Sequence, residues 1–190
     1  MAACIDGGVD VVQLRDKELP DDEVLRRAED LRAVCHEREV PFVLNDRPDL
    51  ARRAAADGVH VGQEDLDPAT TRRVVGTEAL VGLSTHATAE LEAALDGPAG
   101  PAPVDYISAG PVTETPTKPG RPGTGTAYVS EAVARSPWPV WVTGGVRPEI
   151  VPSLVEAGAR HFVVVRWLTE SSDPGSSARR LRAAIDSALA

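Results

Sequence analysis

PFVLNDRPDLARRAAADGVHVG, residues 41–62, is the stretch of sequence that decides the fold. It begins with a short apolar run at 41–45, continues through a helical pattern at 49–56, and ends on a second apolar run at 58–62. Gly58 stands directly after the helical pattern, where glycine suits a turn from a helix into a strand. Two such strands joined by one helix are typical of a β-α-β unit, whose strands run parallel.

The same alternation of strands and helices extends along the whole chain. Further strands are expected at residues 9–15, 80–85, 105–109, 140–143 and 161–166. Further helices are expected at residues 20–39, 68–75, 87–95, 128–134, 148–157 and 174–189. Unbroken apolar runs such as residues 163–165 are typical of strands that a parallel sheet buries on both faces. Seven β-α units in strict alternation predict a parallel sheet, either doubly wound or closed into a barrel.

Two features favour the closed barrel. A dinucleotide-binding sheet would show a G-x-G-x-x-G turn after an early strand, and the sequence has none. Polar residues follow nearly every expected strand, as at the rim of a (β/α)8 barrel, whereas an open sheet concentrates its site at one switch point. The chain begins MAACIDGG, residues 1–8, which looks like the end of a helix that a first strand would normally precede. We therefore predict one α/β domain over residues 1–190, a TIM (β/α)8 barrel that lacks its first β-strand at the N-terminus.

The charge balance excludes one class of ligand. The formal net charge is -9, from 20 Lys and Arg against 29 Asp and Glu, and such a surface repels polyphosphate backbones, so we expect no nucleic-acid partner. No apolar run approaches the ~20 residues that span a bilayer. Since no signal peptide is evident either, we expect no membrane partner and a cytoplasmic location, with Cys4 and Cys35 as reduced thiols. The oligomeric state stays open, with a homo-oligomer among the expectations.

Cationic and amide side chains end the first expected strand. Because alternate strand residues face one side, Gln13 and Arg15 point together into the barrel mouth, with Lys17 close behind. Two cations and an amide can hold an anion with many oxygens, such as a diphosphate. The alternative is an ordinary strand end whose cations form ion pairs with Asp16 and Glu18.

Two acids, Asp46 and Asp65, close successive strands and are expected to be neighbours on the rim. Carboxylates beside cations indicate Mg²⁺, which takes oxygen ligands and shares them with substrate phosphates. The alternatives are a helix cap for Asp46 and a turn for Asp65.

Three further segments suit phosphate groups. The loop GPVTETPTK, residues 110–118, is rich in hydroxyls and ends in Lys118, which suits a phosphate that is enclosed after binding, although a simple turn is the alternative. TGGV at residues 143–146 and VVR at residues 164–166 follow the last two strands, where barrels often bind a phosphate through backbone amides.

No pattern indicates a covalent nucleophile, because neither a Ser-His-Asp order nor a Cys-His pair is present. His86 either donates to a substrate or caps the next helix. The other histidines, His36, His60 and His161, are expected to be structural.

Together these motifs resemble those of thiamine phosphate synthase, from residue 7 to about residue 174. The pieces that carry the resemblance are VQLRDK ending in Lys17, VLNDR with Asn45 and Asp46, GVHVGQEDL with Asp65, GLSTH with Ser84, GPVTETPTKPGRPG with Lys118, VTGGV and VVVR. VQLRDK and TPTK are specific as a set, whereas VTGGV alone would carry little weight. The resemblance implies a transferase of thiamine biosynthesis that couples hydroxymethylpyrimidine diphosphate to a thiazole phosphate, giving thiamine phosphate and pyrophosphate with Mg²⁺.

The resemblance also implies roles for individual residues. The side chains that would hold the pyrimidine diphosphate are Gln13, Arg15, Lys17, Asn45 and Lys118. Asp46 and Asp65 would hold the Mg²⁺, and Ser84 would meet the pyrimidine. The thiazole phosphate would be cradled by Thr115, Pro116, Thr117, Gly145, Val165 and Arg166. The family mechanism is dissociative: pyrophosphate leaves first and the thiazole nitrogen captures a pyrimidine-methyl cation, so Arg15, Lys17 and Lys118 would act by neutralising charge.

The chain departs from the family pattern in three places. The absent first strand would leave two unpaired strand edges, so we expect either a start further upstream or a chain that is poorly stable alone. Trp167 and Leu168 stand where the family usually has smaller residues, which would crowd the thiazole pocket. Thr113 and Glu114 replace an aromatic residue and a proline, which would alter loop closure.

Two other interpretations stay open. A thiazole tautomerase or regulator-like relative of the same barrel would bind thiazole phosphate without joining it to a pyrimidine. Arg15, Lys17 and Lys118 favour the synthase, because a tautomerase has no diphosphate to hold. The second interpretation is a truncated, non-catalytic copy that binds a phosphate ligand.

Overall fold

Seven parallel strands form a single sheet in the computed structural model, which describes residues 1–97, 100–115 and 122–190. The strands are β1 (Val12–Leu14), β2 (Phe42–Asn45), β3 (Gly58–Val61), β4 (Leu80–Thr85), β5 (Tyr106–Ala109), β6 (Val140–Val142) and β7 (His161–Phe162). Their order in the sheet is their order in the chain, and each neighbouring pair is parallel. The predicted parallel sheet is therefore confirmed.

Helices connect the strands and lie outside them. They are α1 (Ala2–Asp6), α2 (Asp21–His36), α3 (Pro48–Arg53), α4 (Pro68–Val75), α5 (Thr88–Leu95), α6 (Gly125–Arg135), the 3-10 helix η1 (Pro148–Ile150), α7 (Val151–Glu156), α8 (Arg166–Thr169) and α9 (Pro174–Leu189). Asp67 and Asp173 begin α4 and α9, because each side chain accepts a hydrogen bond from a backbone N–H of the first turn. None of the described helices combines the length and the apolar character that a membrane span requires.

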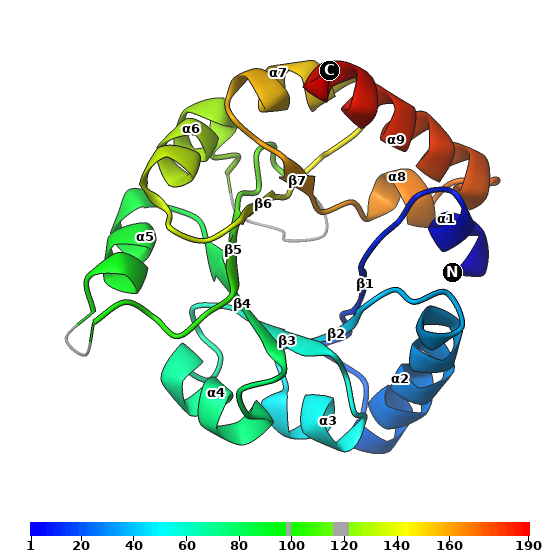
Figure 1. The fold of residues 1–190 in the computed structure, drawn as a ribbon, viewed down its shortest axis with the longest axis vertical. Helices are drawn as coiled ribbons and strands as arrows, with labels where there is room; N and C mark the ends of the chain where they lie inside the picture. The colour runs from blue at the N-terminus through cyan, green and yellow to red at the C-terminus, as the bar shows by residue number, and fades with distance from the viewer. Residues whose placement is uncertain (98–99, 116–121) are drawn as a thin grey trace.

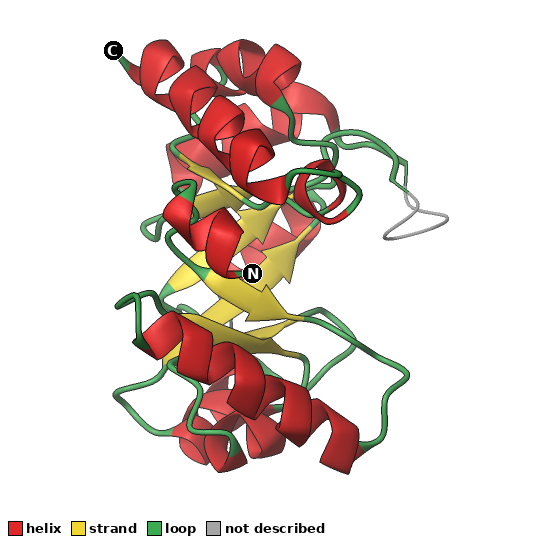
Figure 2. Cartoon of the chain, turned by 90° about the vertical axis from the view of Figure 1, so that its right-hand side faces the viewer, coloured by secondary structure: helices red, strands yellow, loops and turns green. Residues whose placement is uncertain are grey.

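The sheet curls into an incomplete barrel. Figure 1 shows the strands around a common centre with the helices outside, and Figure 2 shows the strand arrowheads directed toward one side of the molecule. β1 and β7 are the two ends of the sheet, and no pairing joins them in the part of the chain that the structure describes. We call these two unpaired strand edges the seam. Near it, α9 packs against α1 and α8. The fold is thus a TIM-like barrel that lacks a strand, as predicted.

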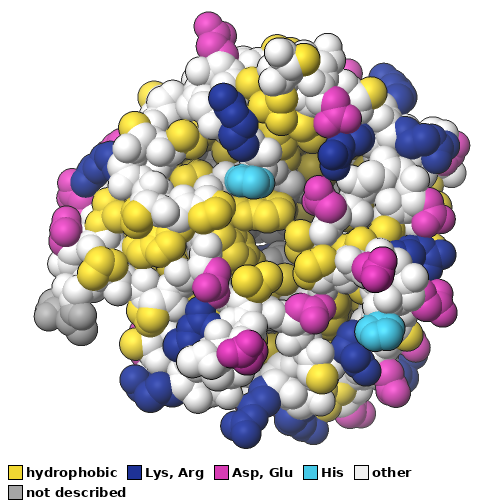
Figure 3. All heavy atoms as spheres, in the orientation of Figure 1, with side chains coloured by type: hydrophobic (Ala, Val, Ile, Leu, Met, Phe, Trp, Pro, Cys, Tyr) yellow, Lys and Arg dark blue, Asp and Glu magenta, His cyan; other side chains and the backbone are white. Residues whose placement is uncertain are grey.

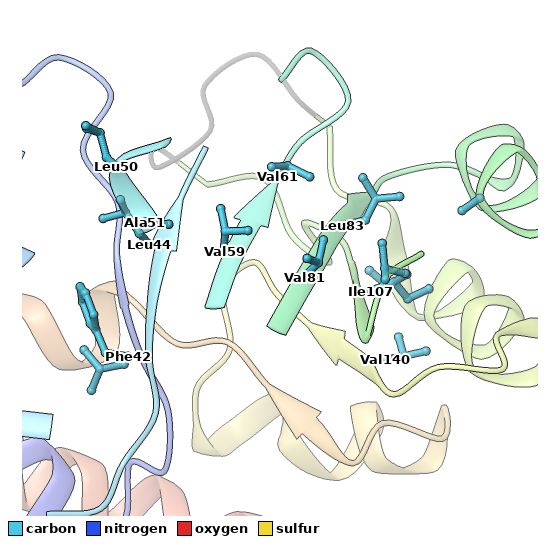
Figure 4. Close-up of a cluster of buried hydrophobic side chains, with 14 of the residues drawn as sticks. Phe42, Leu44, Leu50, Ala51, Val59, Val61, Val81, Leu83, Ile107 and Val140 are labelled. Carbon is cyan, nitrogen blue, oxygen red and sulfur yellow. The ribbon is translucent and has the colours of Figure 1, made fainter. Parts of the chain in front are cut away.

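The main core lies between the outward face of the strands and the helices. Successive strand residues point to opposite faces, so alternate side chains pack against the helices. Leu44 of β2 and Val59 of β3 are almost fully buried on this face and belong to the same cluster as Leu50 of α3 (Figure 4). The intervening residues, such as Asn45 and His60, which are partners in the β2–β3 register, therefore face the barrel interior.

The two ends of the barrel differ in what they present. Figure 3 looks onto the amino ends of the strands, where hydrophobic side chains gather around a central hollow. The polar residues that the sequence singled out belong to the carboxyl ends, on the other side. The candidate site therefore lies at the carboxyl ends of the strands.

The last strand is shorter than predicted. Strand pairing in β7 covers only His161–Phe162, followed by one backbone hydrogen bond from Val163 N to Val142 O at 2.8 Å. Val163 and Val164 are half-buried and Val165 is 42% exposed. The expectation of a strand through residue 166, buried on both faces, is therefore wrong. The physical reason is that, among the described residues, β7 pairs only with β6, so one flank of this segment has no neighbouring strand there to cover it.

Candidate active site

The first group of predicted site residues lies at the carboxyl ends of β1, β2 and β3. Lys17 belongs to the loop between β1 and α2, Asp46 follows β2 directly, and Asp65 lies in the loop between β3 and α4. The parallel register aligns the ends of these strands, pairing Leu14 with Leu44 and Asn45 with His60. Residues distant in the sequence therefore meet on one rim.

The ammonium group of Lys17 lies beside both acids. Lys17 Nζ is 3.0 Å from Asp46 Oδ2 and 4.0 Å from Asp65 Oδ1. The acid side chains are 15% and 19% exposed, whereas that of Lys17 is 52% exposed. The expected neighbourhood of Asp46 and Asp65, which we call the acid pair, is therefore present, with Lys17 pairing with these acids.

The alternatives for the two acids are resolved differently. Asp46 does not cap α3, since the N-cap position is Arg47 and no side chain caps that helix. Asp65 does close a turn, because its Oδ2 accepts a hydrogen bond of 2.7 Å from Gly62 N. Its other oxygen, Oδ1, is the one that faces Lys17. The turn thus orients Asp65 toward the rim and leaves one carboxylate oxygen for the site.

The acid pair is held in an electrostatically unfavourable arrangement. Burial raises the pKa of Asp46, the neighbouring Asp65 carboxyl raises it further, and Lys17 acts in the opposite direction. Asp46 also has a backbone φ of 68°, a conformation that non-glycine residues adopt infrequently. Two partly buried carboxylates that are neighbours favour a cation beside them, which Lys17 supplies.

Two hydrogen-bonded connections hold the loops that carry Lys17 and Asp65. Arg47 donates to Leu19 O at 3.3 Å and forms an ion pair with Asp21, so it fastens the β1–α2 loop to the end of β2. Gln63 Nε2 donates to Ser84 O at 2.6 Å and fastens the β3–α4 loop to β4. The rim positions therefore depend on contacts between successive β-α units.

The other residues predicted to hold the diphosphate, and Ser84, which was predicted to meet the pyrimidine, differ in burial. Gln13 and Arg15 are exposed, while Asn45 at the end of β2 is 9% exposed and Ser84 near the end of β4 is 4% exposed. In the described residues, Arg15 forms no ion pair, so the suggested pairing of Arg15 with Asp16 or Glu18 is not found there. Lys118 lies outside the described residues.

A comparison with known families identifies the chain. The family model described as thiamine monophosphate synthase matches residues 1–168. The chain belongs to this family. A thiamine-phosphate synthase of Thermus thermophilus is 46% identical over 179 residues, which are 93% of this chain and 82% of that protein. One of Thermobifida fusca is 42% identical over 189 residues, 99% of this chain and 85% of that protein.

Solved structures agree on the fold. A thiamine phosphate pyrophosphorylase from Pyrococcus furiosus has a TM-score of 0.87 at 24% identity, covering 100% of this chain and 89% of that one. A 3-hexulose-6-phosphate synthase has a TM-score of 0.66 at 19% identity, covering 96% and 93%. Because differently named proteins share this barrel, the thiamine monophosphate synthase family is assigned from sequence, and the structures show the fold alone.

The second half of the rim carries the glycines predicted to approach a phosphate. Gly144 and Gly145 have φ values of 97° and 75°. A Cβ at Gly145 would lie 2.1 Å from Thr113 Oγ1, and Thr113 N donates to Gly144 O at 3.3 Å. The two glycines therefore let the β6 end lie directly against the β5–α6 loop. Thr115 is described and half-buried, whereas Pro116 and Thr117 lie outside the described residues.

Side chains after the end of β7 have partners within the chain itself. Arg166 begins α8 and forms an ion pair with Glu170, with Arg166 Nε 2.7 Å from Glu170 Oε1. Trp167, which was expected to crowd the thiazole pocket, donates from Nε1 to Ser177 O at 3.0 Å, and the guanidinium of Arg180 lies over its ring. The indole is thereby held against α9.

His86 takes part in structural contacts on both sides. Its backbone N donates to Glu90 Oε2 at 2.7 Å, and its ring Nδ1 contacts Gly110 O. These bonds connect the β4 end to α5 and to the β5 end. The side chain of His86 does not cap α5, because the N-cap residue is Ala87 and it has no side-chain cap hydrogen bond. His86 lines a cavity of about 610 Å³ together with residues of α5, of α6 and of the loops that precede these helices, and no member of the acid pair lines it.

The sequence interpretation missed an interior row of side chains. His60, expected to be structural, places Nε2 2.9 Å from Ser84 Oγ and Nδ1 3.1 Å from Tyr106 Oη. A signal was present: in GVHVG, His60 is the residue of β3 that alternates with the two outward valines. That parity places it on the same face as Asn45, its partner in β2.

Proposed function

We propose that this chain joins 4-amino-2-methyl-5-hydroxymethylpyrimidine diphosphate to 4-methyl-5-(2-phosphoethyl)thiazole, releasing pyrophosphate and forming thiamine phosphate. Family membership and relatives named thiamine-phosphate synthase support this transferase activity. The observation that carries the proposal is Lys17 beside two partly buried acids at the barrel rim. Such a group suits a departing diphosphate better than it suits a hydrolytic acid and base.

The diphosphate is bound at the ends of β1 and β2. Arg15 and Lys17 are exposed cations two residues apart in the loop after β1, so both reach phosphate oxygens. Gln13 and Asn45 supply amide groups beside them. Lys118 adds a third cation from the β5–α6 loop in this proposal. A local cluster of cations is required because the net charge of -9 repels anions elsewhere.

The acid pair fits Mg²⁺ when a diphosphate is also present. In the described residues, no group of three or more His, Cys, Asp and Glu could hold a metal by itself. Mg²⁺ is commonly bound by one or two carboxylates together with substrate phosphates, so Asp46 and Asp65 are a sufficient protein contribution. The raised pKa of Asp46 fits such a site, since it reflects burial beside a second acid. Bound there, Mg²⁺ would neutralise charge on the leaving pyrophosphate.

The residues act by electrostatics and positioning. Arg15 and Lys17 stabilise negative charge that develops as the bond between pyrophosphate and the pyrimidine methylene carbon breaks. The thiazole nitrogen then forms a bond to the methylene cation, so no side chain has to act as nucleophile or general base. Ser84 orients the pyrimidine from the barrel interior. Binding both substrates in one mouth adds the advantage of proximity.

The thiazole phosphate occupies the other part of the rim. Gly145, with its φ of 75° and no Cβ, leaves backbone near the loop that carries Thr115. We assign the phosphate to this loop, residues 115–117, and to the segment of Val165 and Arg166. Arg166 must exchange its exposed Glu170 partner for the phosphate, which costs little because exposed ion pairs are weak.

We further propose that the reaction takes place in the cytoplasm. Cys4 and Cys35 are both free and buried, which is usual for proteins of reducing compartments.

The direct test supplies both substrates and Mg²⁺ and measures thiamine phosphate and pyrophosphate. Lys17→Ala and Asp46→Ala should each lower kcat/KM by about 100-fold or more, because each removes a group that stabilises the leaving charge. Asp30→Ala is the matched control, since Asp30 is an exposed acid of α2 whose partner is Arg26 at 3.7 Å. It should leave the rate unchanged.

The outcomes separate the function from the residue roles. A folded parent that forms no thiamine phosphate rejects the synthase activity. If that parent instead isomerises a thiazole phosphate, it is the tautomerase relative. Full activity in both Lys17→Ala and Asp46→Ala rejects the proposed roles while leaving the reaction intact.

A further inference from the structure

A hydrogen-bonded row crosses the barrel interior behind the acid pair. The strand registers place His60 of β3, Gly82 of β4 and Tyr106 of β5 at the same level. The rings of His60 and Tyr106 stack with centroids 5.4 Å apart, across the intervening strand β4. Ser84, two residues beyond Gly82 and on the same face of β4, contacts His60 Nε2 at 2.9 Å.

Gly82 is what allows this contact to form. A Cβ at Gly82 would lie 2.1 Å from Tyr106 Cζ and 2.5 Å from His60 Nδ1. No other residue type could stand between the two rings without separating them. The pair is therefore a built feature of three neighbouring strands, because a side chain at Gly82 would occupy the space in which the two rings meet.

The direction of the hydrogen bonds follows from the buried groups. Burial raises the pKa of Tyr106, so the phenol keeps its proton, and its partner is His60 Nδ1 at 3.1 Å. If Nδ1 carried the imidazole proton, the phenol proton would be left without this acceptor in a buried place, which is costly. Tyr106 therefore donates to Nδ1, and Nε2–H of the neutral imidazole donates to Ser84 Oγ.

Ser84 then has its own proton left to give. Ser108 Oγ also donates to Ser84 Oγ at 3.5 Å, so the oxygen of Ser84 receives hydrogen bonds from two sides of the barrel wall. Ser84, His60 and Ser108 are 4%, 7% and 4% exposed, so this arrangement is fixed by packing before any ligand arrives. With its oxygen accepting these two bonds, Ser84 keeps its hydroxyl proton available for a ligand in the barrel mouth.

We propose that His60 and Tyr106 are positioning residues that make Ser84 a hydrogen-bond donor to an acceptor ring nitrogen of the bound heterocycle. This inference rests on the proposed function, in which Ser84 meets the pyrimidine. It assigns the recognition chemistry of that subsite. An aromatic ring that presents an acceptor nitrogen to Ser84 Oγ is bound, and a ring that presents a C–H or N–H group to Ser84 Oγ is rejected. His60 acts through Ser84 and touches no substrate atom.

The tautomer of His60 is the first test, and it needs no activity. Nitrogen-15 NMR of the full chain at neutral pH distinguishes Nε2–H from Nδ1–H imidazoles, and the His60 signal is the one that disappears in His60→Gln. We expect the Nε2–H form of His60 in the parent. In Tyr106→Phe, we expect either the Nδ1–H form or a mixture of the two tautomers. An Nδ1–H form in the parent overturns the proposal.

Binding of the pyrimidine diphosphate is the second test. Its KM, and its Kd by calorimetry without the second substrate, should rise about 10- to 100-fold in His60→Leu and about tenfold in Tyr106→Phe, as for loss of one oriented hydrogen bond. His60→Gln should retain most of the affinity, because its amide group donates to Ser84 and its carbonyl accepts from Tyr106. The KM for the thiazole phosphate should stay the same in all three.

His161→Gln is the matched control. His161 stacks on Trp141 of the same interior row, at 5.1 Å between ring centroids, but it lies at the amino end of β7. Its replacement should change neither KM. Circular dichroism of each variant checks that the fold is retained, and the conservative pair Tyr106→Phe and His60→Gln decides the matter if His60→Leu does not fold.

The outcomes keep the two proposals distinct. A folded parent that binds no pyrimidine diphosphate overturns both the function and this inference. A parent that binds it, with unchanged affinity in Tyr106→Phe and His60→Leu, overturns the inference alone. Equal rises in KM for both substrates show a general structural role for His60 and also reject it.

Discussion

The arc formed by β2, β3 and β4 differs from the seam between β7 and β1. Every residue of β2 and of β3 is buried, and each of these strands has a partner on both sides. β1 has one buried residue of three and β7 has none, and each has a single partner among the strands that the structure describes. The acid pair stands on the arc, while the proposed phosphate segment at Val165 and Arg166 follows the seam. The two acids thus lie where each strand has a neighbour on both sides, whereas Lys17 reaches them from the loop after the edge strand β1.

The largest expected effect compares the cores of the two regions. Phe42 of β2 is fully buried, so Phe42→Ala should lower the free energy of unfolding by about 3–5 kcal/mol. Phe162 of β7 is half-buried, so Phe162→Ala should cost less than half as much. Urea unfolding followed by circular dichroism measures both. Equal losses would mean that the seam is as well packed as the arc.

A second effect concerns local opening. The backbone amides of β3 that bond to neighbouring strands should exchange with solvent at least about tenfold more slowly than Val163 N, which bonds to Val142 O of β6. This ratio corresponds to a difference of ~1.4 kcal/mol or more in the free energy of opening. The reason is that β3 can open only together with the other strands of the arc, whereas the segment directly after β7 can open alone. Native-state hydrogen exchange by NMR gives the comparison. Similar protection at both places would show that the seam is closed in solution.

The smallest effect concerns the connection between the end of β2 and the β1–α2 loop. Arg47→Ala removes the bonds to Leu19 O and Asp21, so the loop that carries Lys17 should be held less firmly. KM for the pyrimidine diphosphate should rise up to about fivefold, and the free energy of unfolding should change by about 0–1 kcal/mol. Arg26→Ala is the control, because its ion pairs are confined to α2. The same change in KM in both variants would show that Arg47 does not position the loop that carries Lys17.

The architecture could be predicted because it depends on a repeated pattern. Alternating apolar runs and amphipathic stretches specify a parallel sheet, and the sequence alone also indicated the missing first strand. The ends of the edge strands could not be predicted in the same way. Residues 9–15 and 161–166 are as apolar and β-branched as a central strand, but pairing on one side supports only Val12–Leu14 and His161–Phe162. Strand length there is decided by neighbours that the local sequence does not specify.

The candidate site shows the same division. Asp46, Asp65 and Lys17 could be predicted to meet, since carboxyl ends of successive parallel strands share one rim. The interior contact between His60 and Tyr106 could not, because it depends on Gly82 in the strand between them. A lone histidine in an apolar run indicates core packing by itself. Only the register of three strands shows that it reaches Ser84.

Calorimetric titration with pyrophosphate, in the presence and absence of Mg²⁺, tests the central claim most directly. If Lys17, Asp46 and Asp65 form one site for a departing pyrophosphate, Mg²⁺ should tighten pyrophosphate binding to the parent by about tenfold or more, ~1.4 kcal/mol. The Asp46→Asn, Asp65→Asn double variant should lose this Mg²⁺ effect while keeping its circular dichroism spectrum. An undiminished Mg²⁺ effect in that folded variant would contradict the account.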